Sequence, residues 1–275
     1  MRFRVGLHKL TILTIFFSAI LSAIGIGMPI LHAVEHNPIK LGVMGGDEED
    51  VWKIAVDIAS KQGLHIELVP FSDYSIINEA LSAGDIDANA MQHKPYFDAQ
   101  LAQHGYKLSI IGHTALFPIG VYSRKVKNLD ELRDGAIIGI PDDPSNEGRA
   151  LQIMAQAGLI TLKTPNAILA TPLDIKDNPK KLKFQEMNSG IVGRAIADFD
   201  AVIVNNTWIT SSGINPDKEL IALEKIENNP YDNIIVVRTE DVTKPWAKKL
   251  VAAYQNDSVR NKLQHIFGKT FATSW

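Results

Sequence analysis

The chain of 275 residues contains no cysteine. These residues therefore cannot form a disulfide, a thiolate metal site or a thiol nucleophile, and no lipid can be attached to them through cysteine. The sequence also lacks the hydrolase motif G-x-S-x-G, the zinc-protease motif H-E-x-x-H and a P-loop. We therefore expect no catalytic residues and no enzymatic activity. An enzyme built on the same scaffold is the alternative, but it lacks a paired nucleophile and base.

A surplus of basic residues is absent as well, because 28 lysines and arginines stand against 31 aspartates and glutamates. Residues 1–33 hold three of the basic residues and no acidic residue, so the remainder of the chain is more acidic still. A protein without a basic stripe cannot release counterions from a phosphate backbone. Nucleic acid is therefore not an expected partner.

Patterns for metals and cofactors are weak. The eight histidines include His32 and His36 at helical spacing, but this pair lies beside the apolar segment at the start of the chain. The glycines of residues 42–46 follow a strand-like run, yet their spacing is not G-x-G-x-x-G. We expect neither a metal ion nor a cofactor.

The first residues have the layout of a secretory signal. Arg2, Arg4 and Lys9 precede an apolar run from Leu10 to Leu31 that contains no acidic residue. Small residues suit cleavage after Ala23 or Ala33, but the run is also long enough to cross the roughly 30 Å core of a bilayer as a helix. We assign residues 1–33 as a signal peptide or N-terminal anchor and expect an exported, periplasmic protein that is soluble or tethered to the inner membrane by this segment.

From residue 37 onward, strand-like and helix-like segments alternate. Strand-like runs occupy residues 39–44, 65–71, 86–91 and 108–116. Helix-like runs occupy residues 47–62, 74–82 and 95–104. Such alternation predicts an α/β fold with mainly parallel sheets and flanking helices.

A second series of the same kind begins near residue 123. Strand-like runs occupy residues 136–140, 182–187 and 201–204, and a helix is expected at residues 145–157 with Ser145 or Asn146 available as its cap. A late strand at residues 233–238 and two C-terminal helices then return to the first series. We predict lobe one from residues 37–122 plus 232–275 and lobe two from residues 123–231. Two lobes joined by paired crossings enclose a ligand cleft.

Arg149 is the candidate anchor for a ligand carboxylate. It lies about one turn into the helix predicted at residues 145–157, where the exposed amides of the helix start add positive potential. A guanidinium group can hold a carboxylate through two parallel hydrogen bonds. The alternative is an ordinary surface arginine.

Asparagines form the second group of candidates. Asn205 follows the apolar run 201–204, Asn89 belongs to the run 86–91, and Asn233 lies where the chain returns between the lobes. A carboxamide oxygen can accept from an ammonium group without burying another full charge. Turn or capping roles are the alternative for each of them.

A third group can line an apolar wall with polar tips. It consists of Tyr74, Met91, His93 and Tyr96. Aromatic rings suit a flexible sulfur-containing side chain, because contacts between a thioether and a ring are favourable by about 0.3–1.5 kcal/mol. His93 has the alternative of an ordinary histidine at a helix start.

Several motifs occur in the order in which a known family has them, and they cover essentially all of residues 37–275. They are Phe71–Tyr74, Asn78–Leu81, Asp87–Tyr96, Leu129–Leu132, Asp143–Arg149, Asp177–Pro179 and Trp275. In these residues the chain resembles the methionine-binding lipoprotein (MetQ/NlpA) family of type II periplasmic substrate-binding proteins. The resemblance implies a receptor with the two-lobed type II fold that delivers L-methionine or a close analogue to an ABC permease and its ATPase.

The resemblance also implies roles for single residues. It places Arg149 on the ligand carboxylate, Asn205 and Asn233 around the α-amino and carboxylate groups, and Tyr74, His93 and Tyr96 around the side chain. Met91 stands where the family usually has phenylalanine, which leaves the exact ligand open.

Two other functions remain as alternatives. One is a receptor for a different amino acid or a methionyl dipeptide, and the other is a membrane-associated surface protein of the same fold without a role in transport. Many relatives carry a lipidated cysteine after the signal, which this chain lacks.

Overall fold

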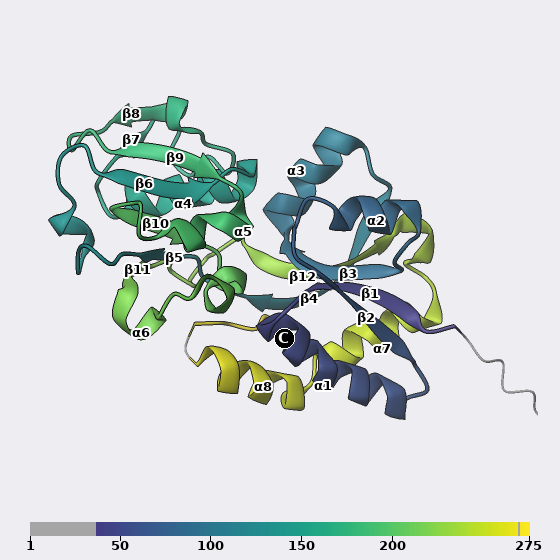
Figure 1. Cartoon of the computed structure of the whole chain (residues 1–275). Helices are drawn as coiled ribbons and strands as arrows, with labels where there is room; N and C mark the ends of the chain where they lie inside the picture. Colours follow the sequence, from purple (N-terminus) through teal and green to yellow (C-terminus); the bar gives the residue numbers. More distant parts are fainter. Residues whose placement is uncertain (1–36, 269) are drawn as a thin grey trace, which may run out of the picture. The chain divides into compact units, whose positions relative to one another are not determined.

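The computed structural model describes residues 37–268 and 270–275, which adopt a two-lobed α/β fold (Figure 1). The predicted signal peptide or anchor at residues 1–33 lies outside the described residues. In the described part of the chain, no helix combines the length and the apolar character that crossing a bilayer requires. Each lobe is built on one five-stranded sheet, and we call these the first and the second sheet.

The first sheet has the strand order β2-β1-β3-β12-β4. Its strands are β1 (Ile39–Met44), β2 (Ile66–Phe71), β3 (Ala88–His93), β4 (Leu108–Leu116) and β12 (Asp232–Arg238). β1 pairs in parallel with β2 and β3, whereas β12 runs antiparallel to β3 and β4. The last part of the chain thus completes the sheet that the first part began.

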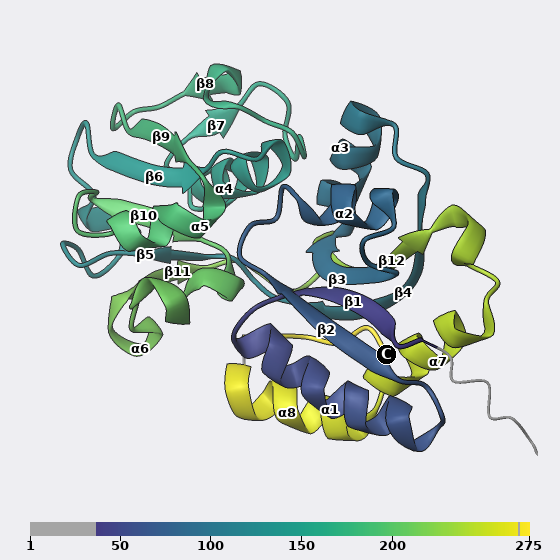
Figure 2. The same cartoon turned by 45° about the vertical axis from the view of Figure 1, so that its right-hand side comes forward.

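Helices cover both faces of the first sheet (Figures 1 and 2). One face carries α1 (Asp47–Lys61), α7 (Pro245–Tyr254) and α8 (Asp257–Phe267), and the other carries α2 (Ile77–Ala83) and α3 (Lys94–His104). The side chains of β12 alternate accordingly. Ile235 and Val237 pack with the first group of helices, and Ile234 and Val236 pack with the second. Burial on both faces explains the continuous apolar run of residues 234–237 in β12.

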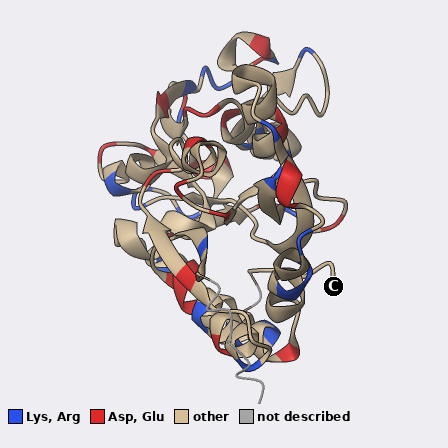
Figure 3. Cartoon of the chain, turned by 90° about the vertical axis from the view of Figure 1, so that its right-hand side faces the viewer, with Lys and Arg blue, Asp and Glu red and all other residues tan. Residues whose placement is uncertain are grey.

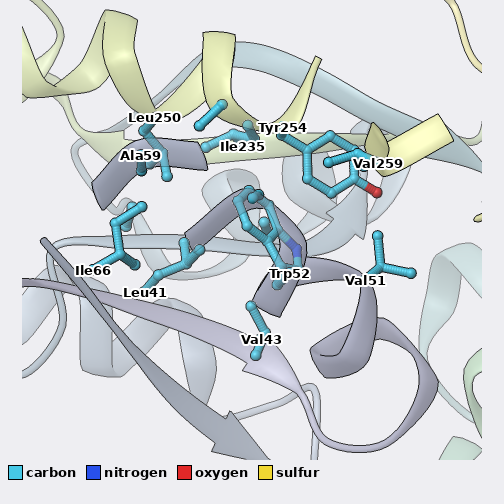
Figure 4. Packing of buried hydrophobic residues seen from close by; sticks show 14 of the residues in the cluster. Leu41, Val43, Val51, Trp52, Ala59, Ile66, Ile235, Leu250, Tyr254 and Val259 are labelled. Atoms are coloured by element: carbon cyan, nitrogen blue, oxygen red, sulfur yellow. The ribbon is translucent and has the colours of Figure 1, made fainter. Parts of the chain in front are cut away.

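Trp52 of α1 lies at the centre of the core between this helix and the first sheet (Figure 4). Its ring centroid lies 4.4 Å from that of Tyr254 on α7, and Leu41 and Val43 of β1 belong to the same cluster. Only 2 % of Trp52 is exposed. Truncating such a side chain to alanine typically costs about 3–5 kcal/mol. This core fixes α1 against the sheet and so places the start of α1 beside the second lobe.

The second sheet has the order β11-β5-β10-β6-β9. Its strands are β5 (Gly120–Tyr122), β6 (Ile137–Pro141), β9 (Lys183–Met187), β10 (Ala201–Val204) and β11 (Leu220–Leu223). Its helices are α4 (Pro144–Gln156), α5 (Ser189–Val192) and α6 (Pro216–Glu219), and a small separate pair is formed by β7 (Thr161–Leu162) and β8 (Ile175–Asp177). Ile203 of β10 faces the cluster that contains α4, whereas Val202 and Val204 face the cluster that contains α5.

Both sheets are mixed, but in each of them four of the five strands run in one direction and a single strand opposes them, which confirms the expectation of mainly parallel sheets. In the second sheet β10 and β9 run parallel to β6, but β5 runs antiparallel to β10 and β11. The antiparallel strands are those next to the crossings. β4 leads directly to β5 of the other sheet, and β12 enters the first sheet after the chain returns. A strand that enters its sheet from the neighbouring lobe runs opposite to strands that are reached through a helix.

The first crossing between the lobes lies close to β5. β5 at Gly120–Tyr122 pairs within the second sheet, although the predicted boundary left residues up to 122 in lobe one. The residue limits of the two lobes remain a prediction.

In the view of Figure 3, acidic and basic residues are interspersed along the ribbon of both lobes.

Candidate functional site

A cavity lies where both lobes contribute side chains. The first sheet and its helices supply residues from β3, β12, α3 and the loop before α2, and the second lobe supplies residues from α4 and the segment after β10. Its lining consists of Tyr74, Met91, Gln92, His93, Tyr96, Phe117, Asn146, Arg149, Asn205, Asn206, Thr207 and Asn233. The structure therefore brings together all seven residues that the sequence nominated as ligand-binding, while their roles toward a ligand remain proposals.

The start of α4 positions Arg149. Pro144 is the first helical residue, and Asp143 before it is extended and caps the helix by accepting a hydrogen bond from the backbone N–H of Asn146 at 3.0 Å. The expectation that Ser145 or Asn146 caps this helix was wrong, because the fixed φ of Pro144 starts the helix one residue earlier. A Cβ on Gly148 would lie 2.2 Å from the backbone oxygen of Ile168, so only glycine fits there.

Arg149 is buried and held in place by an acid from another part of the chain. Its Nε donates to Glu224 Oε1 at 2.9 Å and its Nη2 donates both to Glu224 Oε2 and to the backbone oxygen of Phe117. Its guanidinium carbon lies 4.3 Å from the centroid of the Tyr231 ring. Nη1 has no hydrogen-bond partner among the residues that the structure describes. Arg149 thus keeps one donor nitrogen available in a cavity that it lines.

Sequence reasoning missed Glu224. It is 9 % exposed, follows the short strand β11, and also accepts the backbone N–H of Ile119 at 3.2 Å. It is 75 residues from Arg149, and no local pattern marks it. An arginine expected in a buried cleft is nevertheless a signal that an acidic partner lies elsewhere in the chain, because a buried charge is normally paired.

The side-chain carbonyl oxygen of Asn205 has no hydrogen-bond partner among the described residues. Its Nδ2 donates to Asn146 Oδ1 at 2.8 Å, whereas its Oδ1 is fully buried and finds no partner in the described structure. Such an orphan acceptor costs about 1–3 kcal/mol unless another molecule satisfies it. Asn233, on β12, is paired in register with His93 on β3, which brings these two lining residues side by side.

His93 is a neutral hydrogen-bonding group in this site. Its Nδ1 accepts from the backbone N–H of Tyr96 at 3.1 Å, and its Nε2 lies 3.1 Å from Asn146 Oδ1. Burial, together with the nearby charge of Arg149, lowers the pKa of His93 to about 3. Asn146 therefore connects a residue of β3 with the second lobe, although sequence reasoning considered it only as a helix cap.

Tyr74 and Tyr96 lie close together in the lining of the cavity. The ring centroids of Tyr74 and Tyr96 lie 6.1 Å apart, and Tyr74 also packs at 5.3 Å against Trp208 of the second lobe. Met91 is 4 % exposed and lines the same cavity. Burial raises the pKa of Tyr74 well above its usual range, so its hydroxyl stays neutral.

The sequence nominated Asn205, Asn233 and Asn89 as candidates. Of these three, Asn89 does not line the cavity. It is fully buried and donates from Nδ2 to Asn78 Oδ1 at 2.9 Å, while its own Oδ1 accepts from Gln92 Nε2 at 2.8 Å. Asn78, Asn89 and Gln92 form a closed amide cluster between β3 and α2. Only Gln92 of the cluster reaches the cavity.

Hydrogen bonds join the lobes beside the cavity. Thr207, after β10, donates its hydroxyl to Glu48 in the first turn of α1, and Thr210 donates to Asp47 at 2.8 Å. Burial raises the pKa of Glu48 to about 7. The start of α1 thus contacts the second lobe through its acidic residues.

A model of the NlpA lipoprotein family matches residues 39–275. The chain belongs to this family. Its relatives within the NlpA family include the D-methionine-binding lipoprotein MetQ of Escherichia coli (strain K12), which is 43 % identical over 87 % of this chain and 89 % of the relative. The probable D-methionine-binding lipoprotein MetQ of Vibrio cholerae is likewise 43 % identical, over 88 % of this chain and 90 % of the relative.

Solved structures agree with the NlpA assignment. A nutrient-binding protein from Burkholderia cenocepacia, bound to methionine, superposes with a TM-score of 0.83 at 41 % identity and covers 86 % of this chain and 100 % of its own. A crystal structure of the methionine-binding protein MetQ gives a TM-score of 0.82 at 43 % identity and covers 86 % of this chain and 98 % of its own. The two-lobed binding-protein fold predicted from the sequence is confirmed.

Proposed function

We propose that this member of the NlpA family is a non-enzymatic receptor that binds methionine or a close analogue as a zwitterion and delivers it to an ABC permease. The observation that carries the proposal is a pair of unused groups in one cavity. Arg149 Nη1 is a donor without a described partner, and Asn205 Oδ1 is a buried acceptor without one. A free amino acid supplies what both groups lack, because its carboxylate accepts and its ammonium group donates.

The charges of the cavity favour a ligand of zero net charge. Glu224 already compensates the guanidinium charge of Arg149 through paired hydrogen bonds. His93 adds no charge, since its pKa is lowered to about 3 by burial. A zwitterion brings equal and opposite charges into this balanced site, whereas a simple anion would leave its own charge unmatched.

The aromatic wall supports a thioether side chain. Tyr74 and Tyr96 contribute two aromatic rings to the lining, and Met91 adds a polarizable sulfur. Contacts of sulfur with aromatic rings are worth about 0.3–1.5 kcal/mol each. The names of the MetQ relatives, which specify D-methionine, and the methionine-bound relative from Burkholderia support the same ligand class.

Calorimetry on protein that has been unfolded, dialysed and refolded without ligand tests the proposal. We expect saturable binding of L-methionine or D-methionine with one site per chain. Norleucine, which replaces the sulfur with a methylene group, measures the contribution of the thioether. A methionyl dipeptide and a branched amino acid test the alternative that the receptor serves another ligand.

Absence of binding by both methionine enantiomers and by the dipeptide would reject this ligand class. Turnover of any of these compounds would instead revive the enzyme alternative, to which we assign no catalytic residue. Tighter binding of the dipeptide than of methionine would change the ligand but keep the receptor.

Export and partners complete the proposal. The relatives are named lipoproteins, yet the 275 residues of this chain include no cysteine that lipid could modify. We propose that residues 1–33 direct export, after which the receptor is free in the periplasm or tethered by this uncleaved segment. Mass spectrometry of the mature N-terminus distinguishes the two states.

An uptake assay tests the transport role. Deleting the gene should lower the uptake of labelled methionine at low concentration, and restoring it should recover uptake. Unchanged uptake together with tight binding would favour a membrane-associated protein that no longer serves transport.

A further inference from the structure

We propose that Asp143, which lies outside the residues lining the cavity, is a positioning residue that forces Asn205 to present its oxygen and so selects ligands with a charged α-amino group. This inference rests on the proposed amino-acid receptor function. It adds a residue whose effect passes through Asn146.

The polarity begins at Asp143. Both oxygens of its carboxylate accept from Asn146 Nδ2, at 3.1 Å for Oδ1 and 2.9 Å for Oδ2. An ionised carboxylate can only accept, so the NH₂ end of the Asn146 amide must face it. The oxygen end of Asn146 is then committed to the opposite direction, toward the cavity.

Asn146 passes this polarity to two further residues. Its Oδ1 receives Asn205 Nδ2 at 2.8 Å and lies 3.1 Å from His93 Nε2. An oxygen acceptor requires a donor from each of them. Asn205 must therefore turn its NH₂ group toward Asn146 and its Oδ1 away from it, where that atom is buried and unpartnered.

His93 confirms the same direction independently. The backbone N–H of Tyr96 can only donate, and it meets His93 Nδ1 at 3.1 Å. Neutral His93 therefore carries its proton on Nε2, the atom that faces Asn146. The N–H of His93 Nε2 thus requires the oxygen of Asn146 at this position, which agrees with the orientation imposed by Asp143.

Replacing Asp143 with asparagine breaks the chain of polarity while keeping the helix cap. Asparagine is as good an N-cap as aspartate. Its amide, however, sets an NH₂ group against the NH₂ group of Asn146, and turning Asn146 over relieves this clash between donors at the cost of the hydrogen bond from His93 Nε2. Asn205 is then no longer held to present its oxygen and can present NH₂ to the cavity. An NH₂ group repels an ammonium group but tolerates a ligand that lacks one.

The experiment compares methionine with 4-(methylsulfanyl)butanoate, which is methionine without its amino group. Loss of a hydrogen bond to a charged group costs about 1.5–3 kcal/mol, so Asp143→Asn should reduce the preference for methionine roughly 10- to 100-fold. The matched control is Asp142→Asn, which removes a neighbouring charge; the backbone N–H of Asp142 bonds to Met187. This control should leave the preference within about twofold, because its charge is screened by solvent and lies outside the hydrogen-bonded chain.

A double-mutant cycle tests whether Asp143 acts through Asn146. In an Asn146→Ala background, Asp143→Asn should change the preference no further, since the connecting amide is absent. An equal loss of affinity for both ligands, an equal effect of the Asp142→Asn control, or an undiminished effect in the Asn146→Ala background would each overturn the proposal.

Nitrogen-15 NMR of the ligand-free protein reads the same polarity without any ligand. Wild-type His93 should show the tautomer protonated at Nε2, and Asp143→Asn should perturb that signal or mix the tautomers. An unchanged His93 signal would overturn the relay itself. If wild-type protein binds neither compound, the proposed receptor function fails, and the NMR result still decides whether Asp143 orients the amides.

Discussion

The two ends of the cavity are built differently. The end formed by α4 and the segment after β10 is polar, with Arg149, Asn146 and Asn205 fixed by hydrogen bonds to one another or to buried acids. The end formed by β3, α3 and the loop before α2 is aromatic, with Tyr74 and Tyr96 fixed by packing. The polar end has unused hydrogen-bonding groups, whereas the aromatic end offers surface. We infer that the polar groups of the cavity, which include Asn233 of β12, recognise the amino-acid backbone and that the aromatic end recognises the side chain, so full affinity requires both lobes.

The largest effect is expected at the polar end. Arg149→Ala should weaken methionine binding by about 2–5 kcal/mol, because the carboxylate loses its charged partner. The variant should also unfold more easily, since Glu224 remains buried without a counter-charge. Calorimetry measures the first effect and thermal unfolding the second.

A double variant separates these two losses. Arg149→Met with Glu224→Gln removes both charges and keeps an acceptor for the Ile119 amide, so stability should largely return while binding stays weak. Recovered binding in this variant would show that Arg149 is not the carboxylate anchor.

Glu48, through which α1 contacts the second lobe, should make the free energy of unfolding change with pH by about 3 kcal/mol at most. The pKa of Glu48 is raised by burial from 4.5 to about 7, so the folded protein holds its proton more tightly than the unfolded chain. There is no penalty below pH 4.5, and stability falls as the pH rises through about 7. Unfolding free energies of Glu48→Gln and wild type, measured between these limits, should diverge as the pH rises. Parallel curves would contradict the assignment.

The buried amide cluster between β3 and α2 should affect stability and not recognition. Asn89→Ala removes one hydrogen bond each from Asn78 and Gln92, which stay bonded to each other, and the loss of two buried hydrogen bonds costs about 1–3 kcal/mol. Denaturant unfolding measures this loss. Methionine affinity, measured below the unfolding transition, should stay near the wild-type value because Asn89 does not line the cavity. A large loss of affinity at full folding would place Asn89 in the recognition machinery.

The smallest effect is expected at the aromatic end. Tyr96→Leu keeps an apolar side chain but removes the ring, so methionine should lose about 0.3–1.5 kcal/mol more affinity than norleucine does. Calorimetry with both ligands provides the comparison. Equal losses would mean that the wall recognises apolar surface only, without a preference for sulfur.

Much of the fold was predictable because local patterns are strong where strands are buried and where turn or capping residues mark the ends of helices. β1, β4 and β10 have the predicted bounds, since apolar residues between turn signals leave few alternatives. β11 was not predicted, because its four residues are only partly buried and carry no distinctive period. The direction of β12 and β5 was not predictable from local sequence, because it depends on which lobe the chain comes from.

The candidate site shows the same division. Arg149, Asn205 and the tyrosines could be nominated from residue type, position after a strand and the family motifs. Glu224 and Trp208 could not, since each contacts the site from a distant part of the chain.

The sequence alone determined which chemical groups this protein has and, through hydrophobic period and turn residues, most of the elements that carry them. Tertiary structure decided how those groups are used. It paired Arg149 with Glu224, closed Asn89 into a cluster of amides, and left the oxygen of Asn205 buried without a partner among the described residues. The physical reason is that a hydrogen-bonding group acquires its direction and its unused capacity only from its neighbours, and these neighbours lie far apart along the chain.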